Sequence, residues 1–428
     1  MIYINMKRVI FCIISMWICY STAQDFNTIQ MCNKIYHEDI LSMKMEKNSQ
    51  LFALPVIMLN SNEKLTLRFD DKSDNFKYLR YTFIHCTYNW EPTMSINKSE
   101  YMDRFEDMEI RDFQTSINTL QFYTSYTITF PNEDMRMTKS GNYILYVYDE
   151  DTDEPILTYR FCVSENAVNI SLTADRANDI SKRMTHQQLS LTINHEKIRL
   201  LSPVKYLKTI VIQNGRYDNA ITLTQPTNIT GTSIIYNRPD EILFEGGAEF
   251  RIFNIRTLHT TLEHVLRHDK IAGTNYTHLY MDQSRTYLPY QSEYDINGCY
   301  FITSDDGDSI YGADYTEVHF YLNADKPQDM DFYVYGELTG WELLPEAKME
   351  YNSYKKVWET SLYLKSGYYN YTYLAKPVSD TTCTCFYPEG SHWETQNRYN
   401  AFVYYQGDNM GYDRLIGTAE IESNPKTK

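Results

Sequence analysis

Two groups of side chains have types and spacings that could hold a metal ion. Cys383 and Cys385 are one residue apart, with His392 the nearest further ligand, and His264 and His268 are four residues apart. Two thiols alone do not complete a tetrahedral site. The two histidines would share a metal on a helix but would lie too far apart on a strand, and the neighbouring residues fit a strand equally well. We therefore expect no metal.

The residues between 149 and 160 show part of a calcium-loop spacing. Asp149, Asp151 and Asp153 occupy the first three ligand positions of such a loop. A calcium loop needs glycine at its sixth position and glutamate at its twelfth, whereas this sequence has Glu154 and Arg160 there. A solvent-exposed hairpin turn explains the pattern better.

The sequence carries no motif that would indicate an enzyme. It has no Gly-x-Ser-x-Gly elbow, phosphate-binding loop or dinucleotide fingerprint. The two catalytic carboxylates of a glycosidase have no fixed spacing in sequence, so the sequence does not exclude glycoside hydrolysis. The acidic residues are spread over turns, which is typical of a solvated surface. We expect a protein that is not an enzyme, with no cofactor and no small-molecule substrate.

The N-terminus resembles a secretory signal. Lys7 and Arg8 precede the apolar run 9–20, and Ser21-Thr22-Ala23 forms a small-residue cleavage pattern. We therefore expect residues 1–23 to be a cleaved signal peptide. The chain of 428 residues has 40 Lys+Arg and 56 Asp+Glu, and loss of residues 1–23 changes its formal charge from −16 to −18. So acidic a chain is a poor candidate for binding nucleic acid.

Six cysteines remain after the signal: Cys32, Cys86, Cys162, Cys299, Cys383 and Cys385. They are sparse for this length, so the fold should not depend on disulfides. Cys86 and Cys162 both fall in expected strands of the first domain. They either bridge two sheets in an immunoglobulin-like manner or remain buried thiols.

The pattern of short strands and turns predicts an all-β fold of tandem β-sandwich or immunoglobulin-like domains. Abundant aromatics, 39 Tyr and 19 Phe, favour sheets. The clearest element is a hairpin over 130–163, in which alternating Tyr143, Leu145 and Val147 should face one side. We expect a first domain over 24–163, a second over 164–291, an Asp-rich linker over 292–315 and a third domain over 316–428.

Several motifs, in order along the chain, resemble the type IX secretion system plug protein family. They are FPNEDMRMTKSGNYILYVYDED from Phe130, VIQNGRYDNA from Val211, and the segments 81–90, 100–112 and 245–251. The resemblance implies a non-catalytic periplasmic protein, peripheral to the outer membrane. Such a protein would bind and occlude the periplasmic mouth of the outer-membrane translocon β-barrel, and we expect it to be monomeric when free.

The sequence does not locate the contact face. The polar connection 92–112 and the turn 214–219 are the candidates, because long loops on rigid sandwiches often carry contacts. The candidate partner-binding residues are Arg104, Arg111, Asp112, Asn214, Arg216, Tyr217 and Asp218. For 214–219, turn chemistry alone is the competing explanation.

A rival interpretation concerns the C-terminal domain. The run from Tyr335 to Trp341, then Trp358 and the segment 367–373, resembles the sandwich of starch- and glycogen-binding modules. Under that resemblance the protein would be a periplasmic or surface glycan-binding protein, with Trp341 and Trp393 stacking on sugar rings. The alternative is that Trp341 caps the sandwich and Trp358 fills it, and fold alone does not decide function.

Overall fold

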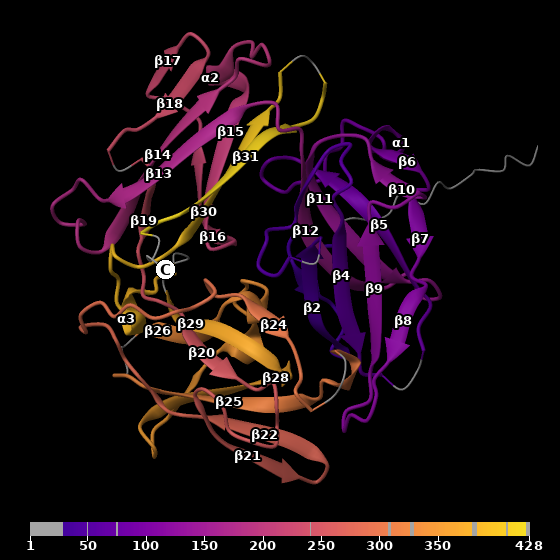
Figure 1. Cartoon of the computed structure of the whole chain (residues 1–428), viewed down its shortest axis with the longest axis vertical. Coiled ribbons are helices and arrows are strands. Elements are labelled where there is room, and N and C mark those ends of the chain that lie inside the picture. Colours follow the sequence, from indigo (N-terminus) through magenta and orange to yellow (C-terminus); the bar gives the residue numbers. More distant parts are fainter. Residues whose placement is uncertain are drawn as a thin grey trace, which may run out of the picture. The chain divides into compact units, whose positions relative to one another are not determined.

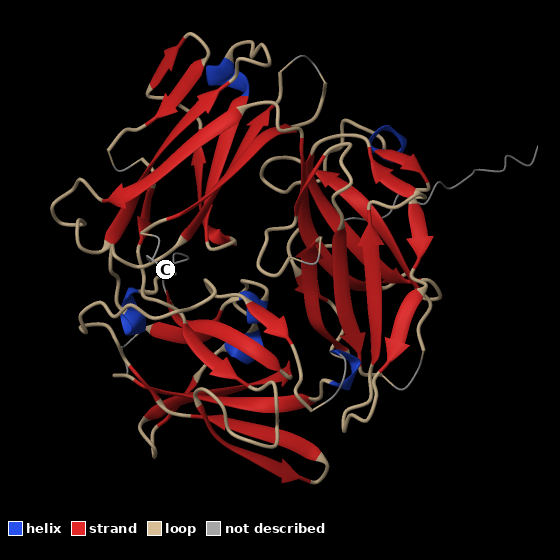
Figure 2. Cartoon of the chain, viewed as in Figure 1, coloured by secondary structure: helices blue, strands red, loops and turns tan. Residues whose placement is uncertain are grey.

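The computed structural model describes residues 29–48, 50–73, 76–239, 241–306, 310–325, 329–378, 383–407 and 410–424. The expected signal peptide, residues 1–23, lies outside these residues. The chain from Met31 onward forms one compact unit. Strands dominate it and helices are single turns, as Figure 2 shows, which confirms the predicted all-β sandwich fold.

The first sandwich is built from the first twelve strands and two main sheets (Figure 1). One sheet contains β1 (Lys34–Ile35), β3 (Val56–Met58), β5 (Leu79–Cys86), β7 (Asp107–Glu109), β11 (Gly141–Asp149) and β12 (Pro155–Ser164). The other has the order β2-β4-β9-β8, with β2 (Ile40–Lys47), β4 (Leu65–Asp71), β9 (Thr124–Phe130) and β8 (Asp112–Thr115). The short helix α1 (Lys98–Tyr101) leads into β6 (Met102–Arg104), which pairs with β10 (Met135–Met137).

The predicted hairpin over 130–163 is confirmed as β11 and β12, which pair antiparallel from Gly141 opposite Val163. Tyr143, Leu145 and Val147 are fully buried in the core of this sandwich. The opposite face of β11 is buried as well, since Ile144 is 0% exposed. That face packs toward the second sandwich, where the Tyr404 hydroxyl donates to Asn142 Oδ1 at 2.7 Å. Both faces of β11 are therefore buried, one in the core of the first sandwich and the other against the second sandwich.

The second sandwich combines strands from two distant parts of the sequence. One sheet contains β13 (Asn169–Arg176), β14 (His186–Asn194), β17 (Asn228–Thr230), β18 (Ser233–Tyr236) and β19 (Leu243–Glu245). The other has the order β16-β15-β30-β31, with β16 (Arg216–Leu223), β15 (Leu207–Gln213), β30 (Arg398–Tyr405) and β31 (Arg414–Glu422). The single turn α2 (Pro203–Tyr206) precedes β15.

The third sandwich is inserted between β19 and β30. One sheet contains β20 (Arg251–Asn254), β24 (Tyr300–Ile302), β26 (Met330–Tyr335) and β29 (Gly367–Pro377). The other contains β21 (Val265–Ile271), β22 (Thr274–Leu279), β23 (Asp282–Gln283), β25 (Tyr315–Asn323), β27 (Glu350–Asn352) and β28 (Val357–Lys365). Four short helical turns complete this part: η2 (Ile310–Gly312), η3 (Glu337–Thr339), η4 (Pro345–Ala347) and α3 (Phe386–Glu389).

The sheets correct the expected domain boundaries in the second half of the chain. Residues 251–283, expected in the second domain, pair within the third sandwich, and residues 398–422, expected in the third, complete the second. The expected linker 292–315 contains β24, which pairs with β29. The physical reason is that a strand pattern indicates that a segment pairs but not which segment is its partner. A domain inserted into another domain therefore looks, in sequence, like two domains that follow one another.

The proposed bridge between Cys86 and Cys162 does not form, and both are free thiols. Both residues lie opposite Asn142, which sits on the strand between theirs. They therefore belong to one sheet and are two strand spacings apart, about 10 Å, which exceeds the reach of a disulfide. The Cys162 thiol instead donates to Asn142 Oδ1 at 3.3 Å.

Candidate functional site

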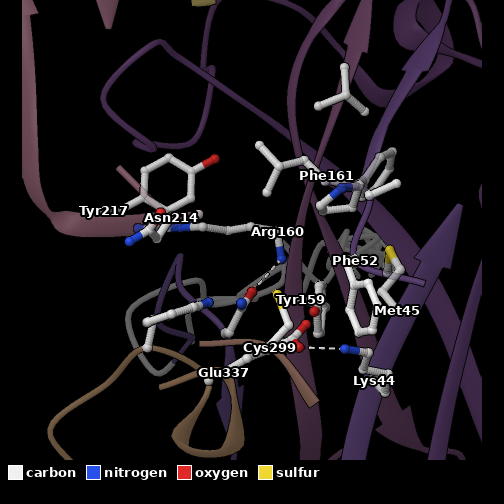
Figure 3. A pocket seen from close by; sticks show the side chains of 18 of the residues that line it. Lys44, Met45, Phe52, Tyr159, Arg160, Phe161, Asn214, Tyr217, Cys299 and Glu337 are labelled. Carbon is white, nitrogen blue, oxygen red and sulfur yellow. Dashed lines mark hydrogen bonds and ion pairs between the residues drawn. The ribbon is translucent and has the colours of Figure 1, made fainter. Parts of the chain in front are cut away.

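The three sandwiches meet at a cavity of about 70 Å³ (Figure 3). The first sandwich contributes Lys44 and Arg160, the second Asn214 and Tyr217, and the third Glu337. We call this region the three-way junction. It is the place where the candidate residues of the 214–218 segment lie, so its chemistry decides what they do.

The Asn214-Gly215 turn joins β15 to β16, as its sequence predicted. Both residues have positive φ, 54° and 78°, which is the conformation of a type I′ hairpin turn. The turn is not a surface loop, because Asn214 is only 7% exposed. Its side-chain Nδ2 donates to Asn397 Oδ1 at 2.8 Å, and its Oδ1 accepts from the Arg398 backbone N–H at 2.8 Å. The side chain thereby fixes the turn to β30.

Arg160 extends from β12 across the junction and lies between two aromatic rings. Its guanidinium carbon is 4.6 Å from the Trp90 ring centroid and 4.8 Å from that of Tyr217, and Figure 3 shows it reaching toward Tyr217. Its Nε donates to the Met31 carbonyl at 2.8 Å. Desolvated cation–π contacts of this kind are worth about 2 kcal/mol. Arg160 therefore joins the first sandwich to the second.

Arg216 and Asp218 form an ion pair that continues into the third sandwich. Arg216 Nε donates to Asp218 Oδ1 at 2.8 Å, and the Tyr335 hydroxyl donates to the same oxygen at 2.8 Å. Burial acts to raise the pKa of Asp218, but the hydrogen bonds and charge of Arg216 outweigh it and hold that pKa below its usual value. Asp218 is thus a charged hydrogen-bond acceptor whose oxygens are already engaged, which favours a structural role over a nucleophilic one.

A neighbouring cleft of about 350 Å³ is lined by Trp90, Asp218, Trp341 and Glu342 among others. Burial raises the pKa of the Glu342 carboxyl, with Arg160 and Lys34 opposing that effect. Among the described residues, no three His, Cys, Asp or Glu side chains gather as a metal site. The charged groups at the junction are chiefly paired with one another, so these contacts hold the sandwiches together.

Three of the sequence-predicted partner residues are exposed and lie on the first sandwich. The Arg104 guanidinium donates to the Glu133 backbone carbonyl. Arg111 has a side chain 79% exposed and donates to Glu109 Oε2 at 3.0 Å. Asp112 begins β8 and is exposed. The structure therefore separates the candidates into an accessible group here and a second group at the three-way junction. In that second group Asn214 and Arg216 are buried, Tyr217 is half-buried and Asp218 is exposed.

The two tryptophans of the glycan-binding interpretation occupy different surroundings. Trp341 is half-buried and makes edge contacts with Phe250 and Tyr335, at 6.1 and 5.6 Å between centroids. Trp393 is half-buried with the Arg176 guanidinium 5.7 Å from its ring. Within the described ranges no ring contact joins the two tryptophans. Trp358, 5% exposed, fills the core of the third sandwich.

Sequence reasoning did not single out the residues that hold the junction together. Arg160 stands in the otherwise uncharged run 156–163, and a charge inside a buried strand was the available signal. Lys365 in β28 offered the same signal, a charged residue inside a buried strand. It is 4% exposed and its Nζ lies 2.6 Å from Asp70 Oδ2 in the first sandwich.

The architecture defines a class of protein: an all-β chain of three sandwiches held together by buried polar contacts. Residues 40–165, which comprise most of the first sandwich, match the family described as Type 9 secretion system plug protein 1st domain. The first sandwich is thereby identified as a first domain of the type IX secretion system plug protein family.

A solved structure supports the fold over nearly the whole chain. A hypothetical protein from Parabacteroides merdae superposes with a TM-score of 0.89 at 32% sequence identity, covering 92% of this chain and 100% of that one. The C-terminal domain of the antigen I/II-family protein AspA from Streptococcus pyogenes has 6% identity and a TM-score of 0.14, with 89% and 99% covered, and supports no argument. No curated protein matches the sequence. None of the helices in the described ranges is long and apolar enough to cross a membrane.

Proposed function

We propose that this protein is a non-catalytic periplasmic plug that binds and occludes the periplasmic mouth of the type IX secretion translocon barrel. The family match over the first sandwich supports a role connected with type IX secretion. The single structural observation that carries the finer statement is the locking of the three sandwiches into one body. A stopper must resist deformation when it closes an opening, and independent modules on flexible linkers would not.

The locking contacts are buried or half-buried and run between different pairs of sandwiches. Lys365 and Asp70 join the third sandwich to the first at 2.6 Å. Lys44 forms a second ion pair across the same boundary with Glu337, drawn as a dashed line in Figure 3. Arg398 Nη1 donates to the Phe52 carbonyl at 2.6 Å, which ties the second sandwich to the first. Breaking such buried pairs costs about 3–5 kcal/mol each, so the body should move as a unit.

The test is affinity purification of the tagged mature protein from its native envelope in a mild detergent, followed by mass spectrometry. We expect a very large outer-membrane β-barrel to co-purify in stoichiometric amount, with an untagged strain as the background control. Absence of such a barrel, in a detergent that preserves other barrel complexes, would refute the proposal.

A leakage assay then separates a stopper from a scaffold. The strain lacking the protein should admit a large hydrophilic dye, and the wild-type gene should restore exclusion. A protein that binds the barrel without changing dye entry would be a scaffold rather than a plug.

A further inference from the structure

One margin of the first sandwich ends in an exposed strand edge. β8 (Asp112–Thr115) is the last strand in the order β2-β4-β9-β8 and pairs with β9, with Phe113 opposite Tyr126. All four of its residues are exposed. A terminal strand presents unpaired backbone N–H and C=O groups, and proteins commonly protect such edges with lysine or proline. β8 contains neither.

An exposed aromatic cluster lies against this edge. We call it the β8 patch, and it consists of Phe76, Tyr78 and Phe113, which are 48%, 54% and 44% exposed. The Phe76 ring centroid is 4.8 Å from that of Phe113 and 5.3 Å from that of Tyr78, so the three rings form one surface. Contiguous exposed aromatics of this kind are typical of protein-binding sites.

The β8 patch is bordered by an acidic turn. The turn 149–154 between β11 and β12 is held beside the patch, because the Glu150 backbone N–H donates to the Tyr78 carbonyl at 2.8 Å. Glu150 pairs with Arg80 at 3.1 Å. Asp151, Asp153 and Glu154 are exposed, and in the described part of the chain none of them makes an ion pair.

The combination of features determines what would bind there. Aromatic faces and unneutralised carboxylates both attract cationic side chains, and Asp112 adds a carboxylate on the edge itself. The exposed Arg111 does not reverse this charge, because Glu109 neutralises it at 3.0 Å. The open edge accepts an extended backbone, as in recognition by strand addition.

A second exposed edge serves as a comparison. β17 (Asn228–Thr230) is also a terminal strand and fully exposed. Its one exposed large apolar side chain is Ile229, at 40%. It has no aromatic residue and no acidic residue of its own. Strand exposure alone is therefore common to both edges, whereas the aromatic and acidic surroundings distinguish β8.

We propose that the β8 edge together with the β8 patch is a docking site for an extended, basic segment of a partner protein. The segment pairs with β8 as a further strand of the sheet, places its aliphatic or aromatic side chains on the patch, and directs lysine or arginine toward the turn 149–154. This inference goes beyond the plug function and does not depend on which protein carries the segment.

The test uses the purified mature protein and fluorescent eight-residue peptides. The probe alternates lysine with valine, one control alternates glutamate with valine, and a second control is the lysine peptide with N-methyl groups at alternate residues, which prevents strand pairing. Anisotropy should give at least about tenfold tighter binding of the probe than of either control, weakening as salt rises. Hydrogen exchange should slow in residues 112–115 when the probe is bound.

Two variants and a matched control locate the binding. F76S/F113S, and separately D151N/D153N/E154Q, should each weaken probe binding about tenfold or more. A thermal scan checks that each variant is still folded at the temperature of the binding assay. Y354S is the control, because Tyr354 is 95% exposed on the third sandwich. The proposal is overturned if the probe does not bind, if the acidic or N-methylated peptide binds equally well, or if F76S/F113S binds like the wild type.

Discussion

The buried pair of Asp70 and Lys365 offers the sharpest test of how the sandwiches are joined. Their side chains are 3% and 5% exposed, and the Lys365 ammonium lies 4.1 Å from the Tyr123 ring centroid. The Tyr315 hydroxyl donates to the same Asp70 oxygen at 2.7 Å. Burial lowers the pKa of Lys365, and the Asp70 carboxylate opposes that shift. Among the described residues, Asp70 is the carboxylate that compensates the charge of this ammonium.

The substitution D70N should reduce the free energy of unfolding by about 3–5 kcal/mol, because it leaves a buried ammonium without its counter-ion. The substitution K365M leaves Asp70 with the Tyr315 hydroxyl but no cation, and should reduce it by a similar amount. The double variant D70N/K365M removes both charges, and should lose clearly less than the two single losses together.

Equilibrium unfolding in urea, followed by tryptophan fluorescence, measures the three values. If unfolding has more than one transition, the transition in which β4 and β28 lose hydrogen-exchange protection is the relevant one. A loss below about 1 kcal/mol for D70N, or strictly additive losses in the double variant, would refute the reasoning.

Three further predictions concern single positions. Burial lowers the pKa of His85 to about 4, with the Ser140 carbonyl partly opposing this shift. The free energy of unfolding should therefore fall by about 3 kcal/mol as pH falls from 6.5 to 4, because the unfolded chain takes up the proton first. H85Q should flatten this dependence in urea titrations at several pH values. G141A should lower the unfolding midpoint in a thermal scan and cost about 2 kcal/mol or more, because Gly141 has φ of 138° and a Cβ there would lie 2.6 Å from His85 Nε2. R160A should speed hydrogen exchange in β16 by removing two cation–π contacts, and R160K should not restore protection, since an ammonium cannot stack as a guanidinium does.

Local patterns predicted local structure well. The alternation in 141–149 and the polar turn after it were sufficient for the β11–β12 hairpin, because both strands and their connection are contiguous. The Asn214-Gly215 turn was predicted for the same reason. The pairing of β15 with β30 was not, since Ile210 lies opposite Phe402 and nothing in either segment specifies so distant a partner.

The candidate site divides in the same way. Arg111 and Asp112 are exposed, as the polar sequence of their connection predicts. Asn214 is enclosed against the distant strand β30, and Arg216 lies over the Tyr335 ring of the third sandwich. The sequence of a single hairpin carries no record of what packs on it. The same argument explains why polar side chains at a domain boundary resemble those of a surface recognition loop.

The return of β30 and β31 to the second sandwich sets an order of assembly for any chain that is synthesised from its N-terminus. The sheets of the first sandwich use no strand beyond residue 164, and those of the third use none beyond β29. The second must wait, with the edge of β15 unpaired, until residues 398–422 have emerged. Loss of even the last two strands would leave that edge permanently open, so C-terminal truncation should produce an aggregating half-built sandwich rather than a shorter functional protein.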